Sequence, residues 1–299
     1  MKLQFHVQGK HQPDPFIFED EGRYYLYVTA VPGIEAYSAD DIFGEWKYEG
    51  IVTKLDGEGY ECWAPSIIKY EGTYYLYFSF IRGEEREFLY VTSAQSPLGP
   101  FGTEKKLYDY FSIDSHVVKT DKGLYLWYAK NSTEGERIGT RVFVDRLLDP
   151  VTPAGDPQEK IVPTFDEEIY TPSYREDFKW HTIEGPFWFQ EGEWQYVMYS
   201  GGCYQDDTYH IGYAAAKTTE GDLTKVTYTK ATKEGAFHPV LIKNAVEEGT
   251  GHHSVIKCGD TYYAIYHARD YDAPRNQEAR TARICKLIVE NGTITAEPM

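Results

Sequence analysis

A strand–turn–strand unit recurs five times along this 299-residue chain, and this repetition limits the possible folds more than any other feature. In each copy an apolar strand leads to a glycine turn and then to a second strand rich in aromatic residues. The copies start 50, 50, 70 and 67 residues apart. They read DPFIFEDEGRYYLYVT from Asp14, APSIIKYEGTYYLYFS from Ala64, DSHVVKTDKGLYLWYA from Asp114, EGPFWFQEGEWQYVMYS from Glu184 and GHHSVIKCGDTYYAIYHA from Gly251.

The five turns are predicted to be tight hairpins, because each is centred on a glycine and glycine tolerates a positive φ. These glycines are Gly22, Gly72, Gly123, Gly192 and Gly259.

The repeat predicts an all-β fold, a five-bladed β-propeller. A hairpin repeated at about the length of one blade implies repetition around an axis. Strand-like pieces between the copies, such as EWKYEGIVT and RIGTRVFV, can complete four-stranded blades. A β-helix has a much shorter repeat, and a sandwich would not repeat this motif five times. We expect residues 1–299 to form one domain, with residues 145–182 as a long surface loop plus an outer strand.

Three of the five copies begin with an acid, at Asp14, Asp114 and Glu184. Taken singly, an acid before a strand is more often a turn or capping residue. If the hairpins are equivalent and innermost, however, these three carboxylates converge at one mouth of the central channel. Burying several like charges together is expensive unless a function or a cation requires it.

Converging carboxyl groups fit the hydrolysis of a glycosidic bond. One carboxylic acid protonates the leaving oxygen while another carboxylate handles water or attacks the sugar. A third acid can raise the pKa of the first by like-charge repulsion. Aromatic residues near the heads of the copies could stack on sugar rings, and we expect this of Trp63, Phe187 and Tyr204.

The motifs DPFIF at Asp14, WAPSI at Trp63, DSHV at Asp114, EGPFWF at Glu184 and GHHS at Gly251 occur in this order at blade spacing. In this respect the chain resembles glycoside hydrolase family 43, whose fold is a five-bladed β-propeller, from about Asp14 to Leu287. The resemblance implies an inverting mechanism. In it Asp14 is the general base that activates water, Glu184 is the general acid, and Asp114 tunes and orients the acid.

The resemblance also implies other site residues. His252 matches a channel histidine that in many members binds a calcium ion or another cation. The alternative is a hydrogen-bonded histidine without a metal, and His253 could take its place. Arg269 and Arg280 match arginines of arabinofuranosidase-like members, and an arginine in the pocket could hydrogen-bond sugar hydroxyls. No organic cofactor is expected.

The expected activity is the exo-acting removal of terminal α-L-arabinofuranosyl residues from arabinose-containing oligosaccharides. The segments SGGCYQDDTYHIGYA and YHAR favour it. A β-D-xylosidase acting on xylose-containing oligosaccharides is the alternative, and an endo-arabinanase is less favoured. A carbohydrate-binding propeller without catalysis, or an interaction scaffold, would not need three converging acids.

Charge and cysteine content bear on partners and compartment. The net charge of −17 repels phosphate backbones, so no nucleic acid partner is expected. No apolar run reaches membrane-spanning length, so no membrane partner is expected. The four cysteines form no CxxC pair, and the N-terminus has no apolar stretch of signal-peptide length. These features predict a cytoplasmic protein with reduced thiols. They do not indicate whether the chain is a monomer or an oligomer.

Overall fold

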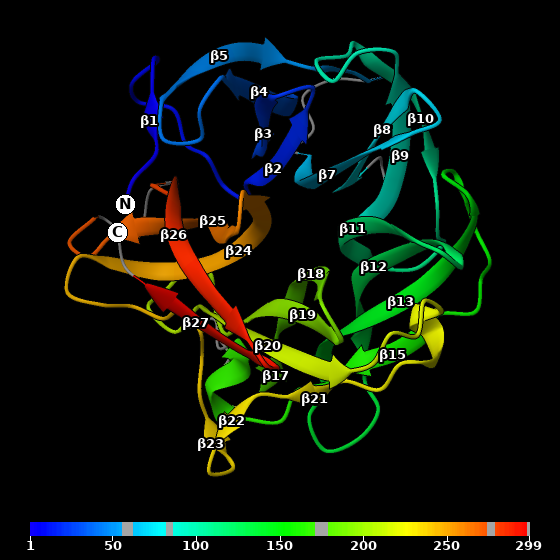
Figure 1. The fold of residues 1–299 in the computed structure, drawn as a ribbon, viewed down its shortest axis with the longest axis vertical. Helices are drawn as coiled ribbons and strands as arrows, with labels where there is room; N and C mark the ends of the chain where they lie inside the picture. Colours follow the sequence, from blue (N-terminus) through cyan, green and yellow to red (C-terminus); the bar gives the residue numbers. More distant parts are fainter. Residues whose placement is uncertain (56–61, 82–85, 171–178, 274–278, 298–299) are drawn as a thin grey trace.

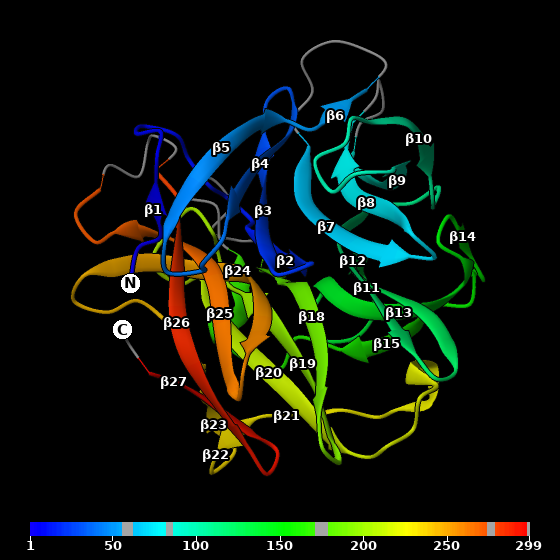
Figure 2. The same cartoon turned by 45° about the horizontal axis from the view of Figure 1, so that its top comes forward.

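A computed structural model describes residues 1–55, 62–81, 86–170, 179–273 and 279–297. Within these residues, five sheets of four or more strands surround a central axis (Figure 1). The all-β propeller predicted from the repeat is therefore confirmed. The strands nearest the axis are the first strands of the five hairpins (Figures 1 and 2), namely β2 (Phe16–Asp20), β7 (Trp63–Tyr70), β11 (Ser112–Thr120), β18 (Ile183–Glu191) and β24 (Glu247–Cys258).

Each blade continues outward from its inner strand in antiparallel steps. Blade 1 adds β3 (Arg23–Ala30), β4 (Gly33–Ala39) and β5 (Glu45–Ile51), and blade 2 adds β8 (Thr73–Phe80), β9 (Phe88–Ala94) and β10 (Phe101–Lys106). Blade 3 adds β12 (Gly123–Ser132) and β13 (Gly139–Asp149), and blade 4 adds β19 (Trp194–Gly201), β20 (His210–Lys217) and β21 (Thr229–Lys230). Blade 5 adds β25 (Thr261–Asp270), β26 (Thr281–Glu290) and β27 (Thr293–Glu297).

Short elements decorate the outer edges of the blades. Residues 145–182 hold more than the loop and single outer strand expected, because four short strands follow the end of β13 and all four extend its sheet. These strands are β14 (Thr152–Pro153), β15 (Gln158–Ile161), β16 (Ile169–Tyr170) and β17 (Trp180–His181). The others are β1 (Gln4–Phe5), β6 (Thr53–Lys54), β22 (Thr232–Lys233) and β23 (Ala236–Phe237), with the 3₁₀ turns η1 (Asp166–Glu168) and η2 (Leu223–Lys225).

The glycine turns between the first two strands of each blade form as predicted. All five glycines have positive φ, from 57° at Gly192 to 139° at Gly123. None of the helices in the described ranges is long and apolar enough to cross a membrane.

Apolar side chains fill the spaces between neighbouring blades. The described residues form five core clusters, and each joins two adjacent blades. For example, Tyr27 of blade 1 packs with Phe78 of blade 2, and Trp127 of blade 3 packs with Val197 of blade 4. Both faces of a blade are therefore buried, which explains why the repeat is so rich in aromatic residues.

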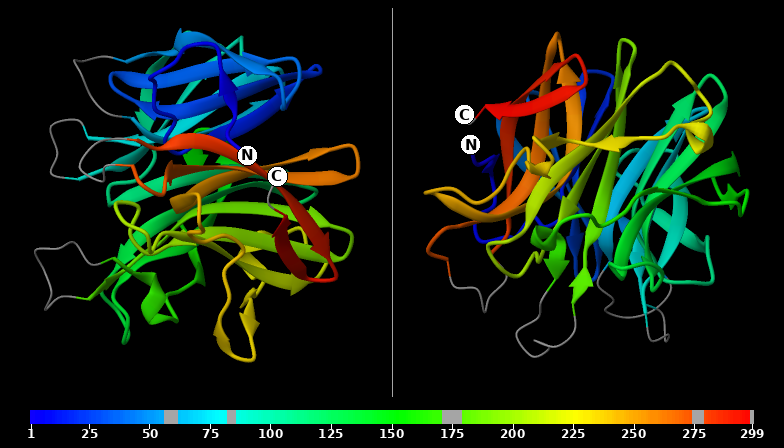
Figure 3. Two further views of the ribbon diagram at one scale, coloured as in Figure 1. Left: turned by 90° about the vertical axis from the view of Figure 1, so that its left-hand side faces the viewer. Right: turned by 90° about the horizontal axis from the view of Figure 1, so that it is seen from below.

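The N-terminal segment closes the ring between blade 5 and blade 1. The amide of Leu3 donates to the carbonyl of Ala282 in β26 (3.1 Å), and β1 pairs in parallel with β5. Leu3 itself is buried in the cluster shared by these two blades. The left view of Figure 3 shows this segment crossing from one blade to the other.

Five equivalent positions near the axis share a left-handed backbone conformation. They are Asp14, Ala64, Asp114, Gly185 and His252, with φ between 41° and 61°. In blades 2 to 5 the pairing of the first two strands slips at this position, as in a β-bulge. A bulge of this kind bends the strand and redirects its side chain, here toward the axis.

This register corrects the sequence comparison in two blades. Glu184 and Gly251 were placed level with Asp14, but the residues with the matching backbone conformation are Gly185 in blade 4 and His252 in blade 5. Glu184 therefore corresponds to Trp63 in blade 2, Ile113 in blade 3 and Gly251 in blade 5. The sequence alignment of the repeats is off by one residue here, because the sequence shows no feature that marks the extra residue of a bulge.

Hydrogen bonds between blades satisfy the amides at these bulges. Thr29 at the end of β3 accepts from the amide of Ala64 in blade 2 (2.9 Å). Ser200 at the end of β19 accepts from the amide of His252 in blade 5 (2.8 Å). The ring nitrogen Nδ1 of His267 in β25 accepts from the amide of Asp14 in blade 1 (3.0 Å). In blades 1, 4 and 5 the end of the second strand thus fixes the inner strand of the next blade.

Candidate active site

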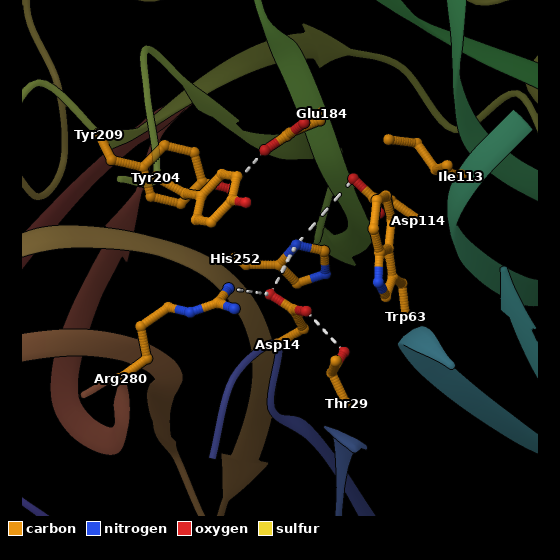
Figure 4. A pocket seen from close by; sticks show the side chains of 10 residues that line it. All are labelled: Asp14, Thr29, Trp63, Ile113, Asp114, Glu184, Tyr204, Tyr209, His252 and Arg280. Carbon is orange, nitrogen blue, oxygen red and sulfur yellow. Dashed lines mark hydrogen bonds and ion pairs between the residues drawn. The ribbon is translucent and has the colours of Figure 1, made fainter. Parts of the chain in front are cut away.

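A pocket of about 100 Å³ lies where the inner strands meet at the axis (Figure 4). Its lining is Asp14, Thr29, Trp63, Ile113, Asp114, Glu184, Tyr204, Tyr209, His252 and Arg280.

Asp14 is held from several blades. Its Oδ2 accepts a hydrogen bond from the hydroxyl of Thr29 (2.6 Å), and Arg280 donates to its Oδ1 (3.3 Å). The Nδ1 of His267 accepts from the Asp14 amide, so that nitrogen carries no proton and the ring is neutral in this arrangement. Nδ1 of His252 lies 3.6 Å from Oδ1.

Asp14 is the ionised carboxyl of the pocket. Burial alone would raise the pKa of Asp14, but His252 and Arg280 outweigh it and hold that pKa well below its ordinary value. Of these, Arg280 carries its charge at every working pH, whereas burial lowers the pKa of His252.

Asp114 and Glu184 are a coupled pair of carboxyls, of which Asp114 is buried and Glu184 is partly buried. Oδ2 of Asp114 accepts from the amide of Gly185 (3.0 Å), and Oε1 of Glu184 accepts from the hydroxyl of Tyr209 (2.7 Å). Burial raises the pKa of Glu184 to about 7, and the charge of Asp14 adds to the shift. Burial, Glu184 and Asp14 also raise the pKa of Asp114 above its ordinary range. The pair therefore retains a proton near neutral pH.

Three of the five residues predicted to bind substrate line the pocket. Trp63 forms a wall opposite Tyr204 and Arg280 (Figure 4). The guanidinium carbon of Arg280 lies 4.9 Å from the centre of the Tyr204 ring, so the two side chains support each other.

Phe187 lies elsewhere, which contradicts its predicted sugar contact. Its ring stacks on His116 at 4.0 Å in the narrow channel below the pocket. Phe187 is two residues beyond the bulge at Gly185, and the shift turns it into the core between blades 4 and 5.

Arg269 also differs from its prediction. Its guanidinium is buried and donates to the backbone carbonyls of Tyr204 (2.7 Å) and Asp206 (3.0 Å). These bonds hold the segment that carries Tyr204 rather than presenting the guanidinium to a sugar.

His252, the predicted cation ligand, lines both the pocket and the channel below it. Its Nδ1 lies 3.6 Å from Asp14 and 4.0 Å from Asp114. Calcium prefers six to eight oxygen ligands, and no group of three or more His, Cys, Asp or Glu residues in the described ranges could hold a metal ion. Protein groups alone therefore do not fit calcium here. The cation stays a prediction, and no step below depends on it.

Three residues around the carboxyls were not found from the sequence. Thr29 and His267 lie at the ends of second strands, 15 residues after the bulge positions of their own blades. Their contact with Asp14 could have been inferred only by aligning the repeats to the residue. Tyr209 lies outside the repeated unit, so nothing in the repeat identifies it.

The arrangement combines an ionised carboxylate with a carboxyl that is still protonated near neutral pH. The first can accept a proton from water, and the second can donate a proton to a leaving group. This is the pair of roles that acid–base hydrolysis requires.

Comparison with known proteins agrees with this chemistry. The model of the family described as Glycosyl hydrolases family 43 matches residues 7–294. A solved structure of a thermostable family-43 glycoside hydrolase is similar with a TM-score of 0.79 and 29% identity, over 98% of this chain and 95% of that one.

Two similar curated proteins are each named an extracellular exo-α-(1→5)-L-arabinofuranosidase. The protein from Streptomyces avermitilis is 26% identical over 93% of this chain, which spans 60% of that relative's length. The protein from Cellvibrio japonicus is 25% identical over 88% of this chain and 80% of its own length.

These names overturn the expected cytoplasmic location. That expectation rested on the N-terminal sequence and on unpaired cysteines, and neither decides the compartment. Cys62, Cys203 and Cys285 are buried in the structure. A propeller with a core between every pair of blades does not need disulfides to be stable in an oxidising environment.

Proposed function

Because this chain belongs to family 43 of the glycosyl hydrolases, we propose that it is an inverting, exo-acting α-L-arabinofuranosidase. It removes terminal arabinofuranosyl residues from arabinose-containing oligosaccharides. We place its action outside the cell, as the names of its two relatives suggest.

The observation that carries the proposal is the opposed charge state of two carboxyls in one pocket. The pKa of Asp14 is held low while that of Glu184 is raised to about 7. Asp14 is then available as a base and Glu184 as an acid at the same pH. In an inverting reaction both act in a single step.

In that step Glu184 gives its proton to the glycosidic oxygen as the bond from this oxygen to the anomeric carbon breaks. A water molecule attacks the anomeric carbon from the opposite face, and Asp14 takes the proton that the water loses. Exchange with solvent then returns a proton to Glu184 and removes one from Asp14. Arg280 keeps Asp14 ionised and offers donors to sugar hydroxyls, while Trp63 offers a face for stacking.

Two observations favour an exo-acting arabinofuranosidase within the family. The pocket is small, at about 100 Å³. Both curated relatives described above are named as exo-acting on α-(1→5)-linked L-arabinofuranose.

The test compares nitrophenyl α-L-arabinofuranoside, β-D-xyloside and galactosides with α-(1→5)-linked arabino-oligosaccharides, using one enzyme preparation. We expect the arabinofuranoside to be hydrolysed fastest and the oligosaccharides to lose single arabinose units from one end. Proton NMR in the first minutes should show the β-anomer, which is the inverted product.

Each alternative predicts a different result. Fastest hydrolysis of the xyloside would assign a β-D-xylosidase, and release of internal fragments would assign an endo-acting enzyme. The α-anomer as first product would exclude inversion. Binding of the oligosaccharides without hydrolysis of any substrate would indicate a carbohydrate-binding propeller.

A further inference from the structure

Tyr209 is a buried tyrosine whose hydroxyl reaches the proposed acid. It lies just before β20, outside the repeated hairpins, and is only 1% exposed. Its hydroxyl donates to Oε1 of Glu184 at 2.7 Å (Figure 4). Burial raises the pKa of Tyr209 well above its ordinary value, so the hydroxyl remains a donor at any working pH.

The ring of Tyr209 is fixed on two sides. It stacks on the ring of His267, with centroids 5.7 Å apart and planes 13° apart. On another side it lies against Gly251, where an added Cβ would overlap the ring. A fully packed aromatic ring aims its hydroxyl in one direction.

The place for this ring exists because blade 5 lacks a side chain at one position. Gly251 is the blade 5 equivalent of Glu184, one residue before the bulge at His252. In blade 4 this position carries the carboxyl. In blade 5 it has no side chain, and the ring of Tyr209 occupies the space. The absence of a side chain at Gly251 in blade 5 thus makes room for Tyr209, the hydrogen-bond partner of Glu184 in blade 4.

We propose that Tyr209 is a positioning residue for Glu184: by donating to Oε1 it confines the proton of the acid to Oε2, the oxygen left to face the glycosidic bond. This inference rests on the proposed function, since it assumes that Glu184 is the general acid. A hydroxyl that donates to one oxygen of a neutral carboxyl leaves the acidic proton on the other oxygen. The same bond stabilises the carboxylate that forms once the proton has been transferred.

The hydrogen bond also sets the pH at which the acid works. A donor to a carboxyl favours its ionised form, so Tyr209 lowers the pKa of Glu184 and opposes the larger effect of burial. The other ionisable groups around Glu184 are Asp14, Asp114, Cys203, Tyr204, His252 and Arg280.

The test is Tyr209→Phe, which removes only the hydroxyl. We expect turnover of an arabino-oligosaccharide to fall roughly tenfold, as for the loss of one hydrogen bond in the transition state. The alkaline limb of the pH–rate profile should move to higher pH, because the acid ionises less readily. Turnover of the nitrophenyl arabinoside should change little, since its leaving group needs little protonation.

A second variant protects the test against a folding defect. Site-specific 3-fluorotyrosine at position 209 keeps the ring and makes the hydroxyl a stronger donor. It should move the alkaline limb to lower pH, opposite to Tyr209→Phe. The matched control is Tyr77→Phe, which removes an equally buried hydroxyl that bonds the carbonyl of Pro150 (2.7 Å) outside the pocket. This control should leave the pH profile unchanged.

The outcomes separate this inference from the proposed function. If Glu184→Gln is inactive on the oligosaccharide but both Tyr209 variants keep the wild-type alkaline limb, the role of Tyr209 is refuted and the acid stands. If Glu184→Gln retains near wild-type activity, the acid assignment itself fails.

Discussion

At the scale of single residues, the pocket holds two carboxyl groups in different protonation states. Asp14 receives donors from Thr29 and Arg280 and is ionised. Glu184 accepts a hydrogen bond from Tyr209, but burial and the charge of Asp14 raise its pKa more than Tyr209 and Arg280 lower it. The identity of the neighbours, and not of the carboxyl, decides which one holds a proton.

Glu184→Gln should remove the proton donor while keeping the shape of the side chain. We expect turnover of arabino-oligosaccharides to fall roughly 10²- to 10⁴-fold, the usual contribution of general acid–base catalysis. The matched control is Glu191→Gln on the same strand, where the carboxyl lies at the exposed end near Lys257. Steady-state rates for the two variants check the prediction, and comparable activity in both would contradict it.

Asp114→Asn should remove one carboxyl of the coupled pair. Repulsion between the two carboxyls raises the pH at which the pair loses its last proton, so removing Asp114 lowers the pH at which Glu184 becomes ionised. Activity requires the protonated acid, and the alkaline limb of the pH–rate profile should therefore move to lower pH, with several-fold lower activity at neutral pH. An unchanged limb would mean that Asp114 itself holds the shared proton at neutral pH.

At the scale of the strand, one missing hydroxyl distinguishes the two equivalent aspartates. In blade 1, the hydroxyl of Thr29 at the end of β3 donates a hydrogen bond to Asp14 and accepts one from the amide of Ala64 in the next blade. The equivalent residue in blade 3 is Ala129, which has no hydroxyl. The amide of Gly185 in the next blade is then accepted by Asp114 directly. Asp114 is thereby drawn toward blade 4, where Glu184 lies.

Ala129→Ser should reproduce the blade 1 arrangement in blade 3. The new hydroxyl would accept the Gly185 amide and donate to Asp114, turning that carboxyl away from Glu184. Because Asp114 would then no longer orient Glu184, kcat/KM should fall roughly 10- to 100-fold. The alkaline limb should shift to lower pH, as for Asp114→Asn.

A control separates this effect from the cost of burying a hydroxyl. Ala36→Ser introduces the same group at a fully buried position in the core between blades 1 and 2. It should lower the thermal midpoint without moving the pH profile. If Ala129→Ser behaves like Ala36→Ser, the hydroxyl at this position does not orient Asp114.

The same strands show what the sequence could predict. The glycine turns and alternating aromatics gave the hairpins, because turns and side-chain alternation are local properties. The assignments of Phe187 and Arg269 failed at a bulge and at a loop contact, respectively. Tyr209 was missed for a similar reason, since its contact with Glu184 joins two segments 25 residues apart that share no pattern.

At the scale of the whole molecule, the ring is closed by the first residues of the chain. Leu3 packs in the cluster shared by blades 5 and 1, and its amide bonds Ala282. The other blade junctions are covalently continuous through the loops between blades. This junction depends on the packing of a short segment and is therefore a sensitive point for stability.

Leu3→Ala should lower the free energy of unfolding by about 2–5 kcal/mol, the usual cost of truncating a buried leucine. Leu148→Ala is the matched control, because that side chain is 70% exposed, and it should change stability by less than about 0.5 kcal/mol. Denaturant unfolding measures both. Equal stability of the two variants would show that the segment does not hold the ring closed. We expect kcat at low temperature to be unchanged in both variants.

The five bulge positions have a consequence for symmetry. The backbone at these positions has the same conformation in every blade, whereas the side chains differ. Around the axis the bulges carry Asp, Ala, Asp, Gly and His in that order. The circular order of side chains, which no single blade contains, therefore gives a nearly five-fold symmetric frame a pocket that has no symmetry.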